Sequence, residues 1–383
     1  MKRQRMVEIR KVSNKKDLKR FIDFRTELYK DSPSAVPYLR MDEEQTLNPC
    51  KNGSFESCEA DYFLAWRDGK VVGRVAAIIN RQANERWQNK VVRFGWFDFI
   101  DDLEVSRSLL QTVEEWGRKR GMTQIAGPMG FADTDREGML IEGFDSMSTM
   151  YANHNFSYYV DHINQLGFRK DNDYVECLVK VPDSVPEKIA LVARVAEERY
   201  HLKVHKLTRK ELLREGYGQE VFDILNITYK DLYGFAELGK KKVDQLVQQY
   251  IRIADLNLVS IVVDSSRDNK MVGFGITFPS LSKAMRKTHG GRLLPFGWWH
   301  LLKAIYWKRD DTVDMLLLGV LPEYRAKGAN AVIFNDLVQQ YIRYGFKWAQ
   351  AMPQMESNHN VLSNWEYFDA TVNKRLRCFI KEI

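Results

Sequence analysis

Two segments of the chain each consist of two largely apolar runs separated by a short polar turn, which is the pattern of a β-hairpin. Residues 61–79 give a strand, a turn at Arg67-Asp68-Gly69 and a second strand. Residues 258–278 repeat this plan with a turn at Asp268-Asn269. Identical residues recur 200 positions later, where Asp68, Lys70, Val72 and Gly73 correspond to Asp268, Lys270, Val272 and Gly273. A repeat of this kind indicates a duplicated unit, the alternative being chance similarity between two hairpins.

The segments that follow each hairpin extend the repeat. Strands are predicted at residues 91–99 and 312–320, and helices at 103–120 and 329–344, each helix ending at a glycine. Final strands are predicted at 174–181 and 373–383. We therefore expect two α/β units of one plan, at residues 1–183 and 184–383, with an insertion at 282–309 in the second.

The junction between the predicted strand at 312–320 and the helix at 329–344 has the features of a phosphate-binding loop. Backbone N–H groups at a helix N-terminus point toward one spot, and the helix dipole adds positive potential there. Gly328 lets a ligand approach the main chain, while Arg325 and Lys327 offset phosphate charge. The alternative is an ordinary strand-to-helix turn that happens to be basic.

At this junction the sequence resembles the GNAT acyltransferase superfamily, whose signature is a strand, then Q/R-x-x-G-x-G/A, then a helix that holds the pyrophosphate of coenzyme A. Arg325 and Gly328 match it, and Asn330 departs from its last small residue. The resemblance spans nearly the whole chain as two GNAT-like units. It implies an α/β fold with mixed α+β sheets, each mostly antiparallel with splayed central strands flanked by helices. Segments 127–131, 140–145 and 233–235 resemble a bacterial tandem subgroup with poorly defined substrates.

The first unit departs from the family at the same junction. Its loop carries Asp101, Asp102 and Glu104, and has neither a glycine nor a basic residue. Carboxylates at a helix N-terminus repel pyrophosphate and serve as caps. We infer that acetyl-CoA or another acyl-CoA, the expected donor, binds the second unit only.

The resemblance implies which residues of the second unit hold the donor. The pantetheine arm would pair with residues 317–320, and the amide near Val320 would face the thioester carbonyl. The full expected set is Leu318, Val320, Arg325, Ala326, Lys327, Gly328, Ala329, Asn330 and Asn358. No metal is expected.

The general acid of the family is commonly a Tyr seven residues after an Asn, but seven residues after Asn358 this chain has Trp365. Tyr367 is a weak substitute because two residues turn it about 200° around a helix. Glu356 and Asp314 are the nearest carboxylates that could act as a base. The alternative is that both are solvated or capping side chains.

An acidic segment in the first unit is a candidate acceptor site. Its carboxylates would select a cationic, amine-bearing small molecule or peptide by charge complementarity. The candidates are Asp133, Asp135, Glu137 and Glu142. The alternative is an ordered connection whose carboxylates cap turns.

The insertion at 282–309 combines basic and aromatic residues without an acid. Its basic residues are Lys283, Arg286, Lys287, Arg292, Lys303, Lys308 and Arg309, and its aromatic residues are Phe296, Trp298, Trp299, Tyr306 and Trp307. Such a segment can lie on an anionic membrane surface, bind an acyl carrier protein or cover a long acyl chain. It can equally pack its aromatics against the sheet and leave its charges in water.

Composition narrows the functional classes. The 383 residues carry 58 Lys and Arg against 51 Asp and Glu, a net charge of +7 that is too mild to favour nucleic acid. The four cysteines are scattered, and no apolar window is long enough for a membrane span, so we expect a cytoplasmic protein. The leading hypothesis is an acyl-CoA-dependent N-acyltransferase, with acetyl as the expected acyl group. Its alternatives are an inactive ligand-binding or scaffolding protein and a long-chain acyltransferase that uses an acyl carrier protein.

Overall fold

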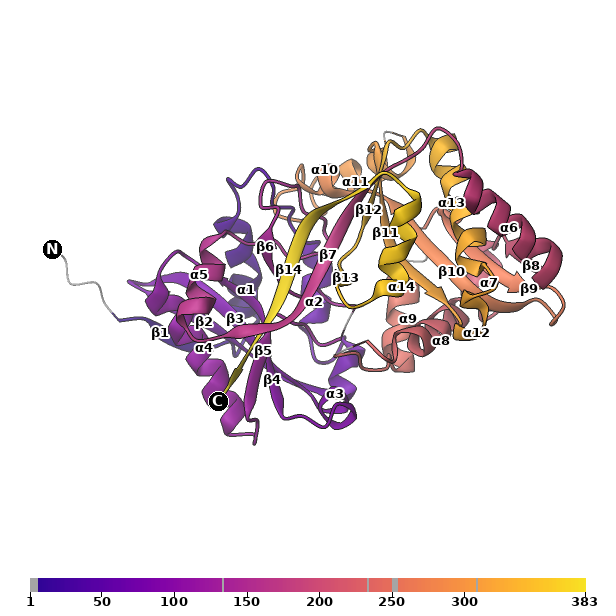
Figure 1. Ribbon diagram of the computed structural model, residues 1–383. Helices are drawn as coiled ribbons and strands as arrows, with labels where there is room; N and C mark the ends of the chain where they lie inside the picture. The colour runs from indigo at the N-terminus through magenta and orange to yellow at the C-terminus, as the bar shows by residue number, and fades with distance from the viewer. Residues whose placement is uncertain (1–5, 133, 233, 250–253, 308) are drawn as a thin grey trace. The chain divides into compact units, whose positions relative to one another are not determined.

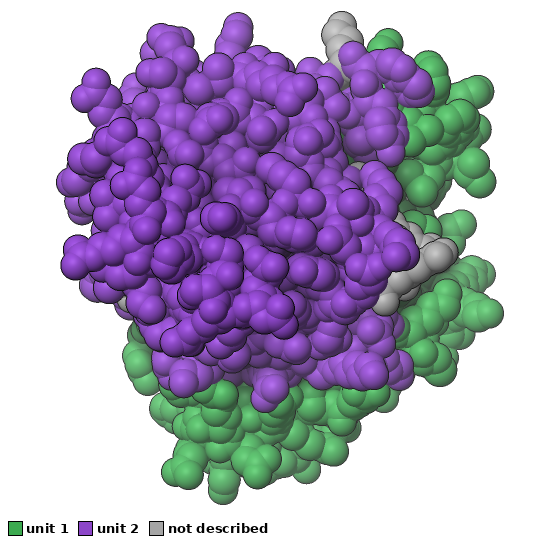
Figure 2. Space-filling view, turned by 90° about the vertical axis from the view of Figure 1, so that its right-hand side faces the viewer, with its two compact units in different colours: residues 1–175, 281–303, 373–383 green, residues 176–280, 304–372 purple. Residues whose placement is uncertain are grey.

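The computed structural model describes residues 6–132, 134–232, 234–249, 254–307 and 309–383. Two compact units make up the chain, and Figure 2 colours the residues of each. Unit 1 comprises residues 1–175, 281–303 and 373–383, and unit 2 comprises residues 176–280 and 304–372. Each unit is therefore assembled from separate stretches of sequence.

Unit 1 is built on a sheet in the order β1-β2-β3-β4-β5-β14. Its elements in chain order are β1 (Glu8–Lys11), α1 (Lys15–Leu28), α2 (Arg40–Thr46), β2 (Cys58–Arg67), β3 (Lys70–Asn80), α3 (Arg81–Arg86), β4 (Val91–Phe99), α4 (Leu103–Arg118), β5 (Gln124–Gly127), β6 (Met139–Glu142), α5 (Tyr158–Gln165) and α10 (Ser282–Met285). Neighbouring strands along this order are antiparallel except for β4 and β5, which run parallel.

The strands β4 and β5 of unit 1 splay apart. Their ladder covers only Val91, Val92 and Arg93 of β4. Farther along β4, Trp96 has a φ of 44°, and the register with β3 shifts at this point. A bulge of this kind bends a strand away from its partner, which opens the space beside the end of β4.

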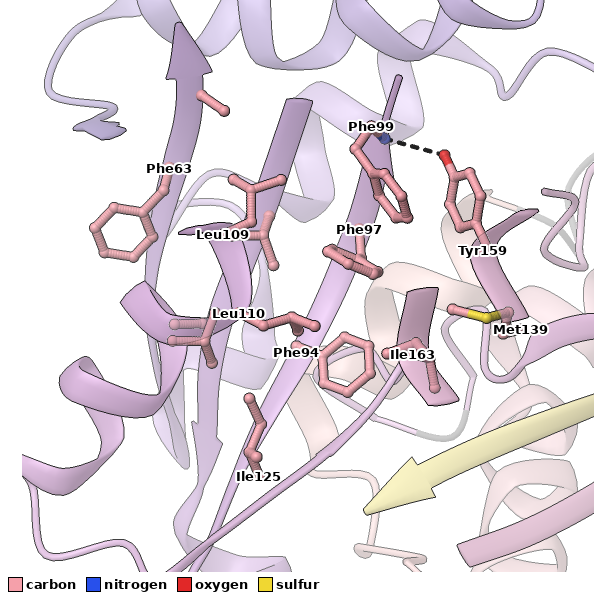
Figure 3. Packing of buried hydrophobic residues seen from close by; sticks show 14 of the residues in the cluster. Phe63, Phe94, Phe97, Phe99, Leu109, Leu110, Ile125, Met139, Tyr159 and Ile163 are labelled. Carbon is pink, nitrogen blue, oxygen red and sulfur yellow. Dashed lines mark hydrogen bonds between the residues drawn. The ribbon is translucent and has the colours of Figure 1, made fainter. Parts of the chain in front are cut away.

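The main core of unit 1 lies between α4 and the sheet (Figure 3). Val105, Leu109 and Val113 recur at intervals of four along α4 and are all fully buried, as an amphipathic helix on a sheet requires. Phe94, Phe97 and Phe99 of β4 supply aromatic packing area from the strand beneath. The Phe99 N–H donates to the Tyr159 hydroxyl at 3.0 Å, a bond that ties α5 to the end of β4.

Unit 2 repeats the plan with the strand order β7-β12-β11-β10-β9-β8. Its elements are α6 (Glu187–Tyr200), β8 (Leu202–His205), α7 (Arg209–Arg214), α8 (Tyr217–Tyr229), α9 (Lys240–Gln249), β9 (Val259–Asp264), β10 (Lys270–Pro279), β11 (Thr312–Val320), α12 (Pro322–Arg325), α13 (Ala329–Tyr344), β12 (Trp348–Ala351), β13 (Gln354–Met355) and α14 (His359–Leu362). The parallel pair is β11 and β12, the counterpart of β4 and β5.

Three elements contribute residues to both units. The strand β7 (Arg169–Lys180) gives residues 169–175 to unit 1 and 176–180 to unit 2, and β14 (Ala370–Glu382) does the reverse. Within unit 1, the C-terminal part of β14, the long yellow strand of Figure 1, pairs with β5. Within unit 2, the end of β7 pairs with β12. The third element is α11 (Gly297–Tyr306).

The predicted elements are confirmed in both halves of the chain. Both hairpins form, as β2–β3 and β9–β10, and the strands at 91–99 and 312–320 have the predicted bounds. The predicted fold class is also confirmed. The division at residue 183 stays a prediction, and the structure adds that residues 282–303 of the expected insertion belong to unit 1.

The described residues include no helix that is both long enough and apolar enough to cross a membrane. All four cysteines are free thiols, with Cys50 exposed and Cys58, Cys177 and Cys378 buried.

Candidate functional site

The predicted phosphate-binding loop of unit 2 forms a tight turn between β11 and α13. The short helix α12 follows Val320, and Gly328 then takes a φ of 80° as the N-cap residue of α13. Among the described residues, no side chain caps this N-terminus. The first amides of α13 therefore keep their donor capacity for a ligand, and the helix dipole favours an anion at this point.

Three side chains fix the loop and its positive charge. The Tyr324 hydroxyl donates to Asp264 at 2.9 Å from a fully buried position, which anchors α12 to β9. Arg325 Nε donates to the Val320 carbonyl at 3.2 Å, so its guanidinium stays at the end of β11. Lys327 Nζ lies 4.4 Å from the centre of the Tyr324 ring. Both cations that the sequence analysis selected are thus held on the loop.

Gly328 is required for packing as well as for its backbone conformation. A Cβ at this position would lie 2.9 Å from Val192 Cγ1 and 3.3 Å from Ala196 Cβ, both on α6. Any larger residue would strain the positive φ and push α6 away. A substitution of Gly328 would therefore change the fold of the loop together with any ligand affinity.

The strand that would hold the pantetheine arm is β11. Its parallel ladder with β12 extends from Thr312 to Met315, so the ladder ends before Leu318 and Val320 are reached. The Tyr229 hydroxyl, at the end of α8, donates to the Leu318 carbonyl at 3.3 Å. Tyr229 therefore lies at the edge of β11 where the donor is expected. The sequence analysis missed it because it is 89 residues from Leu318.

The predicted catalytic side chains lie in different places in unit 2. Asp314 is buried on the paired part of β11, six residues and therefore about 20 Å along the strand from Val320. Glu356 is exposed after β13. Tyr367 is 42% exposed, with Lys188 Nζ 4.5 Å from its ring centre.

The residues around the expected tyrosine position have structural contacts. Trp365 is buried against Phe334 and donates from Nε1 to Gln354 at 2.9 Å. Asn358 is the N-cap residue of α14. Lys188, which contacts Tyr367, lies one turn of α6 before Val192, which contacts the Gly328 position. Four residues of an α-helix rise about 6 Å, so Lys188 lies near the part of α6 that contacts Gly328. Of the predicted catalytic residues, Tyr367 is the one that contacts α6 close to this loop.

The acidic candidates of unit 1 have partners within the fold. Asp135 Oδ2 accepts from the N–H groups of Phe131 and Ala132 at 2.8 and 3.2 Å. Glu137 accepts from the Tyr174 hydroxyl at 2.8 Å, and burial raises the pKa of Glu137. Glu142 pairs with Arg375 at 3.5 Å. Asp133 lies outside the described residues, as do Tyr233 and Lys308. Selection of an acceptor by these acids stays a prediction.

The N-terminus of α4 in unit 1 is closed by its own side chains. Asp102 Oδ1 accepts from the Glu104 N–H at 2.9 Å, which makes Asp102 the N-cap. Arg67 donates to Asp102 at 2.5 Å and to Glu104 at 2.8 Å. These hydrogen bonds from Arg67 lower the pKa of Asp102 and keep it ionised. An anionic ligand would have to displace a carboxylate that already occupies this position.

No protein-family model matches the chain. Among solved structures, the tandem GNAT protein from the clavulanic acid biosynthesis pathway superposes with a TM-score of 0.56 over 98% of both chains, at 11% identity. This chain has the tandem GNAT fold. The fold predicted from the loop and the repeated hairpins is therefore confirmed.

Two curated bacterial proteins resemble this chain over nearly their whole length. Protein YghO of Escherichia coli (strain K12) is 27% identical over 379 residues, which covers 98% of this chain and 95% of the relative. The bacterial ceramide synthase of Caulobacter vibrioides is 26% identical over 381 residues, which covers 96% of this chain and 95% of the relative.

Proposed function

We propose that this tandem GNAT protein is an acyl-CoA-dependent N-acyltransferase that binds its donor in unit 2. The observation that carries the proposal is the N-terminus of α13, where no described side chain provides a cap and where Gly328, Arg325 and Lys327 gather. The N–H groups at a helix N-terminus, the helix dipole and two cations together suit a pyrophosphate. The ladder between β11 and β12 ends at Met315, so the following residues of β11 are not paired with β12, which supports the proposal that a pantetheine arm pairs with them.

The reaction transfers the acyl group from sulfur to nitrogen. A neutral amine attacks the thioester carbonyl, the C–N bond forms, and the C–S bond breaks as the thiolate leaves. The amine loses one proton and the thiolate gains one. We assign the protonation of the leaving thiolate to the Tyr229 hydroxyl, because this hydroxyl lies against the edge of β11 at Leu318.

Asn330→Asp tests the donor site without disturbing the fold. Asn330 is the second residue of α13, where a carboxylate favours the helix N-terminus but repels a pyrophosphate. Gln339→Glu is the matched control, because it makes the same charge change on an exposed position of α13 about 14 Å farther along. We expect calorimetry with acetyl-CoA and palmitoyl-CoA to show that Asn330→Asp weakens binding by at least about tenfold, while Gln339→Glu does not. Equal affinity in both variants would contradict the proposal.

The length of the acyl chain distinguishes two forms of the proposal. The sequence analysis expects acetyl. A long chain is favoured by the relative named a ceramide synthase, since ceramide is the amide of a fatty acid with a long-chain amino alcohol. Mass spectrometry of reactions with acetyl-CoA or palmitoyl-CoA, each with a long-chain or a short amine, separates the two forms. Absence of any amide product would favour the alternative of an inactive scaffold.

The exposed aromatic segment also supports the long-chain form. Leu294, Phe296, Trp298 and Trp299 are 76%, 69%, 43% and 46% exposed. They follow the exposed cations Arg286, Lys287 and Arg292. Apolar and aromatic side chains beside cations suit an anionic membrane surface, where a lipid acceptor would reside. We propose that this segment docks on such a surface.

Vesicle sedimentation tests the docking. We expect Leu294→Ala with Phe296→Ala to weaken binding to phosphatidylglycerol vesicles by about tenfold, from the apolar area lost. Met41→Ala with Val372→Ala is the control, since both of these residues are 54% exposed elsewhere. Equal loss in both double variants, or binding to an acyl carrier protein without any binding to vesicles, would contradict the membrane assignment.

A further inference from the structure

Unit 1 contains a cavity of about 290 Å³ that carries an excess of positive charge. It is bounded by α1, by the chain from Ser32 to Arg40 and by residues 286–290 of the insertion. Its charged lining consists of Arg25, Lys30, Arg40, Arg74 and Arg286 against Glu43. The volume approaches the lower end of small-molecule sites, which begin at about 300 Å³.

The inner wall of the cavity is an ion cluster in which two arginines share one carboxylate. Arg25 Nη1 donates to Asp98 Oδ1 at 2.8 Å, and Arg74 Nε donates to Asp98 Oδ2 at 2.8 Å. Arg25, Arg74 and Asp98 are only 8%, 1% and 3% exposed. A second, smaller space lies against the same Arg25, Arg74 and Tyr38, so the two arginines separate two compartments. The cluster alone has a net charge of +1.

The neighbouring charges do not remove this excess. Glu43 is already paired with Arg136. Asp23 is shared between Arg40 and Arg292, and Arg40 also pairs with Glu44, so these two acids are balanced by two arginines. Burial, and then Arg25 and Lys374, lower the pKa of His154 to about 4, so that this ring is neutral at pH 7. The walls are thus more cationic than their acids can balance.

Residues 286–290 belong to unit 1, and the residue that follows them is hydrogen-bonded to the first residue of α2. The Arg40 N–H donates to the Gly291 carbonyl at 3.0 Å. Gly291 has a φ of 75°, and a Cβ there would lie 1.8 Å from the Tyr38 carbonyl oxygen. This close approach places the exposed Arg286 on the cavity wall.

A buried excess of charge destabilises a protein unless a counter-charge accompanies it. Guanidinium groups bind carboxylates and phosphates through two parallel hydrogen bonds, which makes them suitable partners for such an anion. We propose that the cavity of unit 1 binds a small molecule through an oxyanion, a carboxylate or a phosphate, with Arg25 and Arg74 at its base and Arg286 at its wall. This site is independent of acyl-CoA binding in unit 2 and goes beyond the proposed function.

Calorimetry with the full chain tests the site with three probes: inorganic phosphate, glycerol 3-phosphate and succinate. We expect at least one of them to bind with a Kd below about 1 mM. Arg286→Ala should weaken that binding by about tenfold, since it removes one charged hydrogen-bond donor from an exposed position. Arg81→Ala is the matched control, because Arg81 is exposed in unit 1 and pairs with Glu59 outside the cavity. Thermal melting of each variant reports whether the fold is retained.

Arg25→Lys sharpens the test, because it keeps the charge and removes the planar fork. We expect the Arg25→Lys variant to bind the probes more weakly than the wild type does, although the charge of the ion cluster is the same in both. Binding of the probes should persist in the Asn330→Asp variant and at saturating acetyl-CoA, which separates this site from the donor site.

A phosphate ligand can be a free metabolite or a lipid headgroup. A short-chain, water-soluble phosphatidic acid compared with glycerol 3-phosphate distinguishes these sources. Tighter binding of the lipid indicates a headgroup, and equal binding indicates a phosphorylated metabolite. The proposal is overturned if none of the probes binds below about 1 mM. It is also overturned if Arg286→Ala and Arg25→Lys both bind as the wild type does.

Discussion

The two units of this chain share a fold and differ at the same register position of their sheets. Gly73 pairs with Phe99 in unit 1, and Gly273 pairs with Val320 in unit 2. One step along, unit 1 pairs Arg74 with Asp98, whereas unit 2 pairs Phe274 with Gly319. The same place in the fold therefore holds a buried ion pair in one unit and an aromatic ring over a glycine in the other.

The N-terminus of the helix that follows each of these strands also differs between the two units. Asp102 caps α4, and Arg67 neutralises the cap. Gly328 starts α13, and no described side chain caps that helix. The strands and helices of the two units correspond because each core requires them, while a few side chains at one junction differ in charge. Our proposals accordingly place a small oxyanion in the cavity of unit 1 and a pyrophosphate at the helix N-terminus of unit 2.

The largest expected effect comes from removing the shared carboxylate of unit 1. Asp98→Ala would leave two buried guanidiniums without their common partner, which should lower the free energy of unfolding by about 3–5 kcal/mol. Urea unfolding measures this change. Glu59→Ala is the control, because Glu59 forms its ion pairs at the surface and its loss should cost at most about 1 kcal/mol. Equal losses would show that the ion cluster does not hold unit 1 together.

The next largest effect is expected on activity, when the proposed proton donor of unit 2 is removed. Tyr229→Phe should lower kcat by about a hundredfold with little change in KM, because the hydroxyl acts as the thiolate leaves. Tyr367→Phe is the matched comparison, since the sequence analysis selected that tyrosine. Steady-state kinetics across pH measures both. If Tyr367→Phe lost more activity than Tyr229→Phe, the assignment would pass to Tyr367.

The buried histidine of unit 1 predicts a pH dependence. In the folded state the pKa of His154 is lowered to about 4, mainly by burial. His154 therefore takes up a proton near pH 6.5 in the unfolded chain, whereas in the folded chain it stays neutral at that pH. The contribution of His154 to stability should be complete above about pH 6.5 and fall by about 2 kcal/mol as the pH drops to about 5. Thermal melts of wild type and His154→Gln over this range should show a shallower decline in the variant. Parallel curves would contradict the prediction.

The smallest effect concerns the cap of α4. Asp102→Ala removes the cap and one bond to Arg67, so we expect a loss of about 1 kcal/mol in stability. The variant should gain no affinity for acyl-CoA, because the loop still lacks a glycine with a positive φ and a cation. Calorimetry that showed acquired binding would mean that the cap alone excludes the donor.

The sequence was sufficient for the local features of the fold. Apolar runs on either side of a short turn predicted both hairpins, and the predicted bounds of β4 and β11 were correct. The loop at Arg325 and Gly328 was visible as a local motif, although the packing of Gly328 against Val192 was not.

Long-range features were not accessible from local patterns. Arg25, Arg74 and Asp98 are separated by dozens of residues, and each looks like an ordinary charged position until the sheet brings them together. The pairing of the last residues of β14 with β5 of unit 1 joins parts of the chain more than 250 residues apart. No periodicity marks such a contact, and none marked Tyr229 either.

Diffraction from crystals grown with a non-hydrolysable acyl-CoA analogue tests the central claim most directly. The account predicts pyrophosphate density against the amides of residues 328–330, with the pantetheine arm along β11 beside Leu318. Pyrophosphate density at Asp102 and the N-terminus of α4, with the N-terminus of α13 unchanged, would contradict it.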